Sequence, residues 1–249
     1  MARKTQKPLK AKITEDHPFH EVITEAYRIF DYPKPGATGV CTDCCMEPEI
    51  ERDFFTPEIA ELPLHYLNDW FFAACEPELP KSIWAYLLPR VLEVLAVGGD
   101  APATVGIEVS LNRYQTGRRE NWSKAEWAVL DRFQRLYLRR TVAGTEPFLD
   151  DILCMFGIAG WPLDDLFAQV LEAPDEILIP RLWDDWCIGR PQIWLTEFWE
   201  GGGNSAAYDF YTSDAIYDRA VAFGLDESAP AALARKARDV ASVIESARA

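Results

Sequence analysis

The chain has 249 residues, a formal net charge of −15 and a sequence pI near 4.6. Hydrophobic residues make up 49% of it and aromatic residues 12%, which is enough apolar surface for a folded core and excludes an intrinsically disordered chain. The excess of acids repels phosphate backbones, so general binding of nucleic acids is disfavoured.

The first residues, MARKTQKPLKAK, are basic but lack the apolar stretch of a signal peptide. No apolar run approaches the roughly 18 residues that a membrane-spanning helix needs. We therefore expect a cytoplasmic protein with a flexible basic segment at 1–13, and six cysteines that remain thiols.

Helical periodicity dominates the first half. Apolar residues recur at steps of three and four over 19–30 and 66–74, and a further helix is predicted over 81–97. Pro48 begins a short helix. Pro89 lies inside the 81–97 helix and is expected to kink or split it.

The stretch 100–121 has no clear periodicity. Its segment TVGIEVSL is rich in β-branched residues and fits either a strand or an extended connection. We also predict that a joint between two halves of the helical domain, if there is one, lies around 98–122.

The second half opens with a capping box, Ser123 with Glu126, whose helix ends at Gly144. Pro147 and Pro162 mark the next two helix starts, and such short turns require the three helices to fold back on one another. The later helices are predicted at 181–188, 191–200, 213–223 and 229–247.

The run GGGNS at 201–205 is predicted to be a flexible loop. Taken together, these elements predict an all-α fold, as an irregular helical bundle or an α-solenoid-like array of antiparallel helices. We expect 14–249 to form a single helical domain.

Three cysteines lie within five positions in GVCTDCCMEPE, at Cys41, Cys44 and Cys45. Cys41 and Cys44 have the spacing of one zinc knuckle, but a structural zinc site usually needs four ligands and no second knuckle follows. The other interpretation is that these thiols pack as small apolar residues in a turn.

Histidines would have to supply the missing ligands. His17 and His20 are spaced to share one helix face, and His65 is the third histidine of the chain. A metal-binding module or metal-dependent enzyme with zinc at the three clustered cysteines is therefore the alternative functional hypothesis.

Pairs of aspartates lie at 150–151, 164–165 and 184–185. Neighbouring side chains on a helix point about 100° apart, so a pair does not by itself form a two-carboxylate site. Each pair lies near a predicted helix start, where acids interact favourably with the helix dipole.

The segment Trp183-Asp184-Asp185-Trp186 places two acids between two indoles, which would attract a cation. The alternative is an amphipathic helix with one indole buried and one half-covered. An aromatic pocket that also includes Trp194 and Trp199 is a third, small-molecule hypothesis, against which a core role is the simpler explanation.

Signatures of catalysis are absent from the sequence. It contains no GxSxG, GxxxxGK[ST], GxGxxG or HExxH motif. The sequence therefore favours a protein that is not an enzyme.

Four segments in this order resemble a family of uncharacterised bacterial cytoplasmic proteins with an early cysteine-containing segment and an L-P-R-containing helix. They are FDYPKPGATGVCTDCCMEPEIERDFF, YLLPRVLEVLAVGG, GIAGWPLDDLF and FYTSDAIYDRAVAFGL. The resemblance covers about 28–245, but Trp84-Ala85-Tyr86 stands where that family tends to carry a histidine. The resemblance implies a bacterial, cytoplasmic, single-unit helical protein, and it implies no catalytic residue.

Charge is unevenly distributed. Residues 113–140 are rich in arginine, whereas 146–185 hold ten acids against Arg181 alone. Solvated helix faces of opposite sign would explain this. The functional hypothesis beside this simpler explanation is a non-catalytic binding protein that engages a basic protein partner, such as a bacterial immunity protein that neutralises a cognate toxin, or a DNA-mimicking inhibitor. The predicted contact residues are Asp164, Asp165, Asp184 and Asp185.

Overall fold

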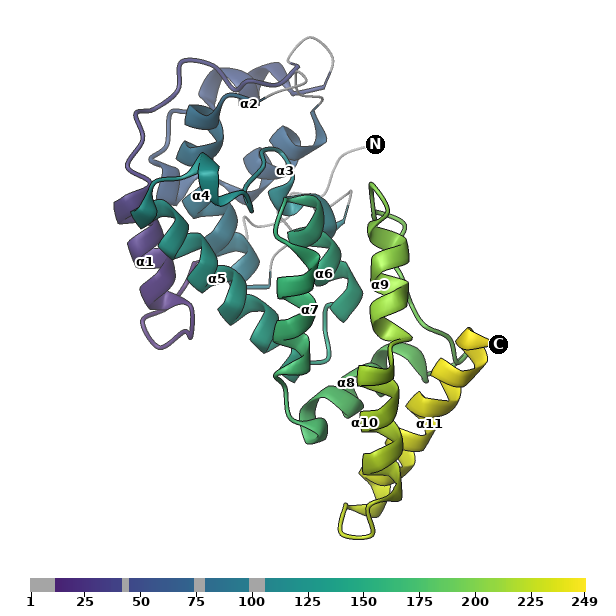
Figure 1. Cartoon of the computed structure of the whole chain (residues 1–249). Coiled ribbons are helices and arrows are strands. Elements are labelled where there is room, and N and C mark those ends of the chain that lie inside the picture. The colour runs from purple at the N-terminus through teal and green to yellow at the C-terminus, as the bar shows by residue number, and fades with distance from the viewer. Residues whose placement is uncertain (1–11, 42–44, 74–78, 99–105) are drawn as a thin grey trace, which may run out of the picture. The chain divides into compact units, whose positions relative to one another are not determined.

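The computed structural model describes residues 12–41, 45–73, 79–98 and 106–249 (Figure 1). The secondary structure of these residues consists of helices without a strand, which confirms the predicted all-α fold. No helix in these ranges is long and apolar enough to cross a membrane.

The chain divides into two compact units, 1–133 and 134–249. The division falls inside one helix, α5 (Lys124–Ala143), and so lies C-terminal to the joint predicted at 98–122. The single domain over 14–249 stays a prediction, and each unit is described by itself.

The described residues of the first unit form four helices before α5 and three short 3₁₀ segments. The helices are α1 (His20–Ile29), α2 (Pro48–Asp53), α3 (Leu64–Phe72) and α4 (Lys81–Ala96). The 3₁₀ segments are Ile59–Glu61, Ile107–Leu111 and Arg119–Asn121. All four helices match predicted ones.

Helix α4 forms much of the core of the first unit, because every residue from Ile83 to Ala96 is buried. Pro89 lies within α4 and does not split it. Trp84 stacks on Trp70 of α3, with ring centroids 6.0 Å apart, and its indole N–H donates to the Thr116 hydroxyl at 2.9 Å.

A buried ion pair lies on α4. Arg90 Nη1 is 2.6 Å from Glu93 Oε2, and the same oxygen accepts a hydrogen bond from the Tyr27 hydroxyl at 2.7 Å. Burial and the neighbouring Glu93 raise the pKa of Tyr27. Such charges are tolerated in a core only when paired and hydrogen-bonded, as these are.

The segment predicted as strand or extended connection is 3₁₀ helix over Ile107–Leu111, and 99–105 lie outside the described residues. Thr116 fixes the turn that follows. Its hydroxyl donates to the Leu111 carbonyl at 2.7 Å, and its own carbonyl accepts from the Trp122 indole at 2.8 Å. β-branched residues did not form a strand here because strand preference depends on cross-strand packing.

The second unit contains the end of α5 and six further helices. They are α6 (Leu149–Ile158), α7 (Leu163–Leu171), α8 (Asp175–Trp186), α9 (Gly203–Tyr211), α10 (Asp214–Leu225) and α11 (Ala231–Arg248). Helices α8, α10 and α11 pack together, and α6 contacts α7, α8 and α9 (Figure 1).

The capping box at the start of α5 is confirmed. The Ser123 N–H donates to Glu126 Oε2 at 2.7 Å, and the Glu126 N–H donates to Ser123 Oγ at 3.3 Å.

Two local predictions in the second unit are wrong. The helix predicted at 191–200 is irregular, because the Thr196 N–H donates to the buried Asp150 carboxylate at 2.7 Å. The loop predicted at 201–205 instead contains the start of α9 at Gly203, which packs against the Trp199 ring.

Candidate functional site

The cysteine cluster precedes α2. Cys41 and Cys45 are half-buried, and Cys44 lies outside the described residues. Where the structure describes the chain, no three His, Cys, Asp or Glu side chains are grouped to hold a metal ion. Cys44 is not among those residues, so a zinc site at this cluster stays a prediction.

The histidines do not share a helix face as predicted. Helix α1 begins at His20, and His17 lies in the preceding turn, where its Nδ1 accepts a hydrogen bond from the Phe19 N–H at 3.3 Å. His65 lies on α3 and packs edge-on against Tyr66, with ring centroids 4.8 Å apart.

Asp185, one of the predicted contact residues, is inside the second unit with a side chain only 5% exposed. Its Oδ2 accepts hydrogen bonds from Arg181 Nε at 3.0 Å and from the Leu149 N–H at 3.1 Å. Burial raises the pKa of Asp185 to about 6, against the opposing effect of Arg181. Asp185 therefore stabilises the chain around the start of α6.

Asp184 is half-buried and already has a cation from the same chain. Lys236 Nζ lies 3.0 Å from its carboxylate and 4.0 Å from the centre of the Trp183 ring. The Trp183 indole N–H donates to Asp239 Oδ2 at 2.9 Å. The cation expected near these indoles is thus the lysine of α11. Trp183 is half-covered and Trp186 is 2% exposed, as the amphipathic-helix interpretation predicts.

The tryptophans of the predicted aromatic pocket have separate partners. Trp186 packs edge-on against Tyr211, with ring centroids 5.2 Å apart, and the Trp199 indole donates to Asp150 Oδ2 at 3.1 Å. Trp194 is 42% exposed. These contacts support a structural role for Trp186 and Trp199.

Cys187 is a thiol at the end of α8 with suppressed reactivity. Burial and the nearby Asp239 raise its pKa to about 11, against the opposing effect of Lys236. A thiol with such a pKa stays protonated at neutral pH, and the protonated form is a poor nucleophile.

Asp164 and Asp165, by contrast, are exposed in the first turn of α7. Glu172, at the end of α7, and Glu176, in the first turn of α8, are also exposed. Their carboxylates form no ion pair with any described residue. These four acids are therefore available to another molecule.

Three side chains of α7 share its solvent-facing side. Asp165, Gln169 and Glu172 are spaced by four and three residues, which places them on one helix face over about 10 Å. The opposite face carries buried residues such as Leu166 and Val170. The solvent face of α7 thus has a carboxylate near each end.

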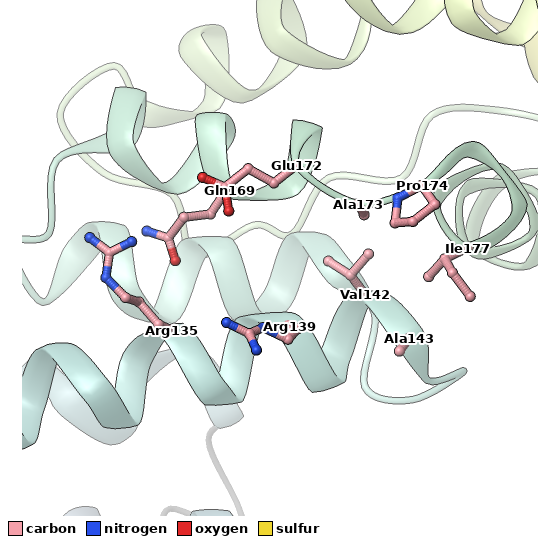
Figure 2. Close-up of a pocket in the computed structure, with 9 residues that line it drawn as sticks. All are labelled: Arg135, Arg139, Val142, Ala143, Gln169, Glu172, Ala173, Pro174 and Ile177. Atoms are coloured by element: carbon pink, nitrogen blue, oxygen red, sulfur yellow. The ribbon is translucent and has the colours of Figure 1, made fainter.

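A groove of about 320 Å³ borders this face of α7. Figure 2 shows the α5 side chains on one wall and those of α7 and the α7–α8 turn on the other. The lining residues are Arg135, Arg139, Val142, Ala143, Gln169, Glu172, Ala173, Pro174 and Ile177.

The two ends of the groove differ in chemistry. Arg135 and Gln169 lie at one end, whereas Val142, Pro174 and Ile177 make the other end apolar (Figure 2). Gln169 is held in place by Gln134, since the two amides exchange hydrogen bonds at 3.1 and 3.3 Å. The groove can therefore accept an apolar side chain at one end and a polar group at the other, where Glu172 also contributes a carboxylate.

The sequence revealed the arginine-rich segment but not the groove. Arg135 and Arg139 are four residues apart, so their shared helix face could have been predicted. The second wall could not, because Ala173 and Pro174 belong to a turn whose neighbours depend on tertiary packing.

Comparisons of the chain with models of protein families, with curated protein sequences and with solved structures gave no match. The resemblance to a bacterial family therefore stays a hypothesis.

Proposed function

We propose that this protein is a non-catalytic binding protein whose second unit engages a basic protein partner through α7 and the start of α8. The proposed contact residues are the four exposed acids, Asp164, Asp165, Glu172 and Glu176. Complementary charge of this kind accelerates encounter and selects among partners.

The observation that carries the proposal is the division among the acids of 146–185. Asp150, Asp175, Asp184 and Asp185 each bind a group of the same chain. The four exposed acids named above have no such partner among the described residues. Ion pairs and hydrogen bonds within the chain engage the first group. The helix dipole favours Asp164, Asp165 and Glu176 in their first turns, but it leaves their carboxylates exposed to solvent.

The neighbouring groove supplies shape to this surface. A partner that places lysine or arginine over α7 would set an apolar side chain beside Ile177, which is 40% exposed. Arg135, Arg139 and Glu172 give the rest of the groove both signs of charge, and a partner has to match this pattern, which restricts the alignments that it can adopt.

In a bacterial cytoplasm, an acidic helical protein of this kind would serve as an immunity protein that occupies the basic surface of a cognate toxin. The acidity of the chain and the exposed carboxylates support this role. A metal-dependent role at the cysteine cluster is the alternative, and metal analysis of the purified protein would test it.

The proposal is tested by affinity capture from the source cells with the full chain immobilised. Wild type is compared with Asp164→Asn/Asp165→Asn, and with Asp209→Asn/Asp218→Asn, which removes two exposed acids elsewhere in the same unit. We expect wild type and the control to retain a basic protein at low salt and release it at high salt, and the α7 variant to lose it. Equal retention by all three, or an acidic retained protein, would reject the proposal.

A further inference from the structure

Phe148 and Trp194 form an exposed aromatic pair in the second unit. Their ring centroids are 5.5 Å apart, with the ring planes inclined by 30°, and each residue is 42% exposed. Large aromatic side chains at the surface are typical of the residues that dominate binding energy at protein interfaces.

Buried polar groups hold the Phe148 side of the pair. Arg181, which is 1% exposed, donates hydrogen bonds to the carbonyls of Gly144 and Pro147. The Leu149 N–H donates to Asp185 at 3.1 Å. The backbone on both sides of Phe148 is thereby fixed to the interior.

A second buried carboxylate holds the Trp194 side. Asp150, which is 3% exposed, accepts hydrogen bonds from the Thr196 N–H at 2.7 Å and from the Trp199 indole at 3.1 Å. A pair of rings that is already ordered loses little conformational entropy when a partner binds.

The charged residues that flank the pair along the chain are acidic. Glu146 and Glu197 are exposed and lie two and three positions from Phe148 and Trp194 along the chain, whereas no lysine or arginine lies within three positions of either ring. Attraction between exposed charges falls off beyond the Debye length, which is about 8 Å at physiological salt. The two carboxylates therefore attract a cation near the rings most strongly at low salt.

The same unit already pairs a cation with an indole, since Lys236 covers the face of Trp183 at 4.0 Å. Within the described part of the chain, no lysine or arginine covers Trp194 in this way. An aromatic face with negative charge beside it attracts a cation, and a guanidinium group stacks on such a face better than an ammonium group does.

We propose that Phe148 and Trp194 bind an arginine side chain of the partner, with the guanidinium stacked on the rings and Glu146 and Glu197 attracting it. This inference rests on the proposed function, because it assigns an anchor residue to the basic partner. It adds a contact site that is separate in sequence from the acids of α7.

The probe is a synthetic peptide of alternating arginine and glycine, and its control is the same peptide with citrulline, which keeps the shape of arginine without its charge. Binding to the full chain is measured by titration calorimetry. Trp194→Ala and Phe148→Leu are each expected to weaken the arginine peptide roughly threefold or more. Phe72→Ala, which removes a 65% exposed ring in the first unit, should leave binding unchanged.

Thermal unfolding of each variant checks that it is folded. If Trp194→Ala does not fold, Phe148→Leu serves as the test, because it keeps an apolar side chain at its site.

Equal binding of the citrulline peptide, or no binding of the arginine peptide by wild type, would overturn the inference. If Asp164→Asn/Asp165→Asn weakens the arginine peptide while the ring variants do not, the aromatic site is rejected and the acidic surface stands. The reverse pattern would keep the aromatic site and reject the acidic surface of α7.

Discussion

Arg181 of α8 shows how one buried residue organises the second unit. Its guanidinium binds the carbonyls of Gly144 and Pro147 and the carboxylate of Asp185. Removing one member of a buried ion pair leaves the other charge unpaired, which typically costs about 3–5 kcal/mol. We therefore expect Arg181→Met to lower the free energy of unfolding by about that amount in urea denaturation.

The exposed Arg190, four residues after Trp186, is the matched control, since Arg190→Met should change stability by less than about 0.5 kcal/mol. In the double variant Arg181→Met/Asp185→Leu no charge is left unpaired, so part of the loss should be recovered. A single variant as stable as wild type would show that the ion pair does not hold this region.

Glu126 of the α5 capping box gives the stability a defined pH dependence. Burial raises its pKa, but hydrogen bonds from Tyr32 and Ser123 and the charge of Lys81 outweigh this, and the pKa ends below 4.5. The ionised form is therefore favoured in the folded state, so the contribution of Glu126 is present above about pH 4.5 and is lost as the pH falls through the folded pKa.

The test is the free energy of unfolding of wild type and Glu126→Gln, measured by urea denaturation at about pH 7 and about pH 3. At about pH 7, wild type should have a larger free energy of unfolding than Glu126→Gln. At about pH 3, the difference between the two proteins should be smaller. Glu120→Gln, at an exposed acid nearby, should show no such change. A difference that is the same at both pH values would mean that the charge of Glu126 is not responsible.

At the scale of elements, helix α9 depends on a glycine. A Cβ added at Gly203 would lie 2.5 Å from the Trp199 ring, which is itself held by Asp150. Overpacking of this kind typically costs about 1–3 kcal/mol, so Gly203→Ala should be destabilised by that amount in thermal or urea unfolding.

Gly36→Ala is the control, because a Cβ at Gly36 would meet no atom within 4 Å. It should be neutral or slightly stabilising, since alanine restricts the unfolded chain. If Gly203→Ala is as stable as wild type, Trp199 can move, and the close packing at the start of α9 is not needed.

Most helices could be predicted because their signals are local. The Ser123–Glu126 capping box and the helix starts near Pro48 and Pro162 depend on residues within one turn, and the structure has helices there. The irregular segment 191–200 could not be predicted, because its backbone is bound by Asp150, which is far away in the sequence.

The same distinction applies to the candidate site. Asp164 and Asp165 are exposed, as a contact surface requires, because their pair lies in a first helical turn with the apolar residues of α7 on the other side. Asp185 points inward because it forms an ion pair with Arg181, and Asp184 forms an ion pair with Lys236 on α11. The second of these contacts joins helices distant in sequence, which no local pattern reveals.

At the scale of the whole molecule, which has a net charge of −15, the acidic residues fall into two groups. Some acids neutralise buried or half-buried cations of the same chain, and others remain at the surface. The proposed function concerns the second group, and charge alone does not define its site. In the proposed function, the groove beside α7 would accept an apolar side chain of the partner, and Phe148 and Trp194 would bind an arginine of it.

The most direct test of the acidic surface is the dissociation constant for the captured basic partner, measured over a range of salt concentrations. Asp164→Asn/Asp165→Asn should weaken binding roughly fivefold or more at low salt and reduce the salt dependence, because two exposed charge contacts are lost. Asp209→Asn/Asp218→Asn should bind as wild type does. The same dissociation constant and the same salt dependence for wild type and the α7 variant would contradict the account.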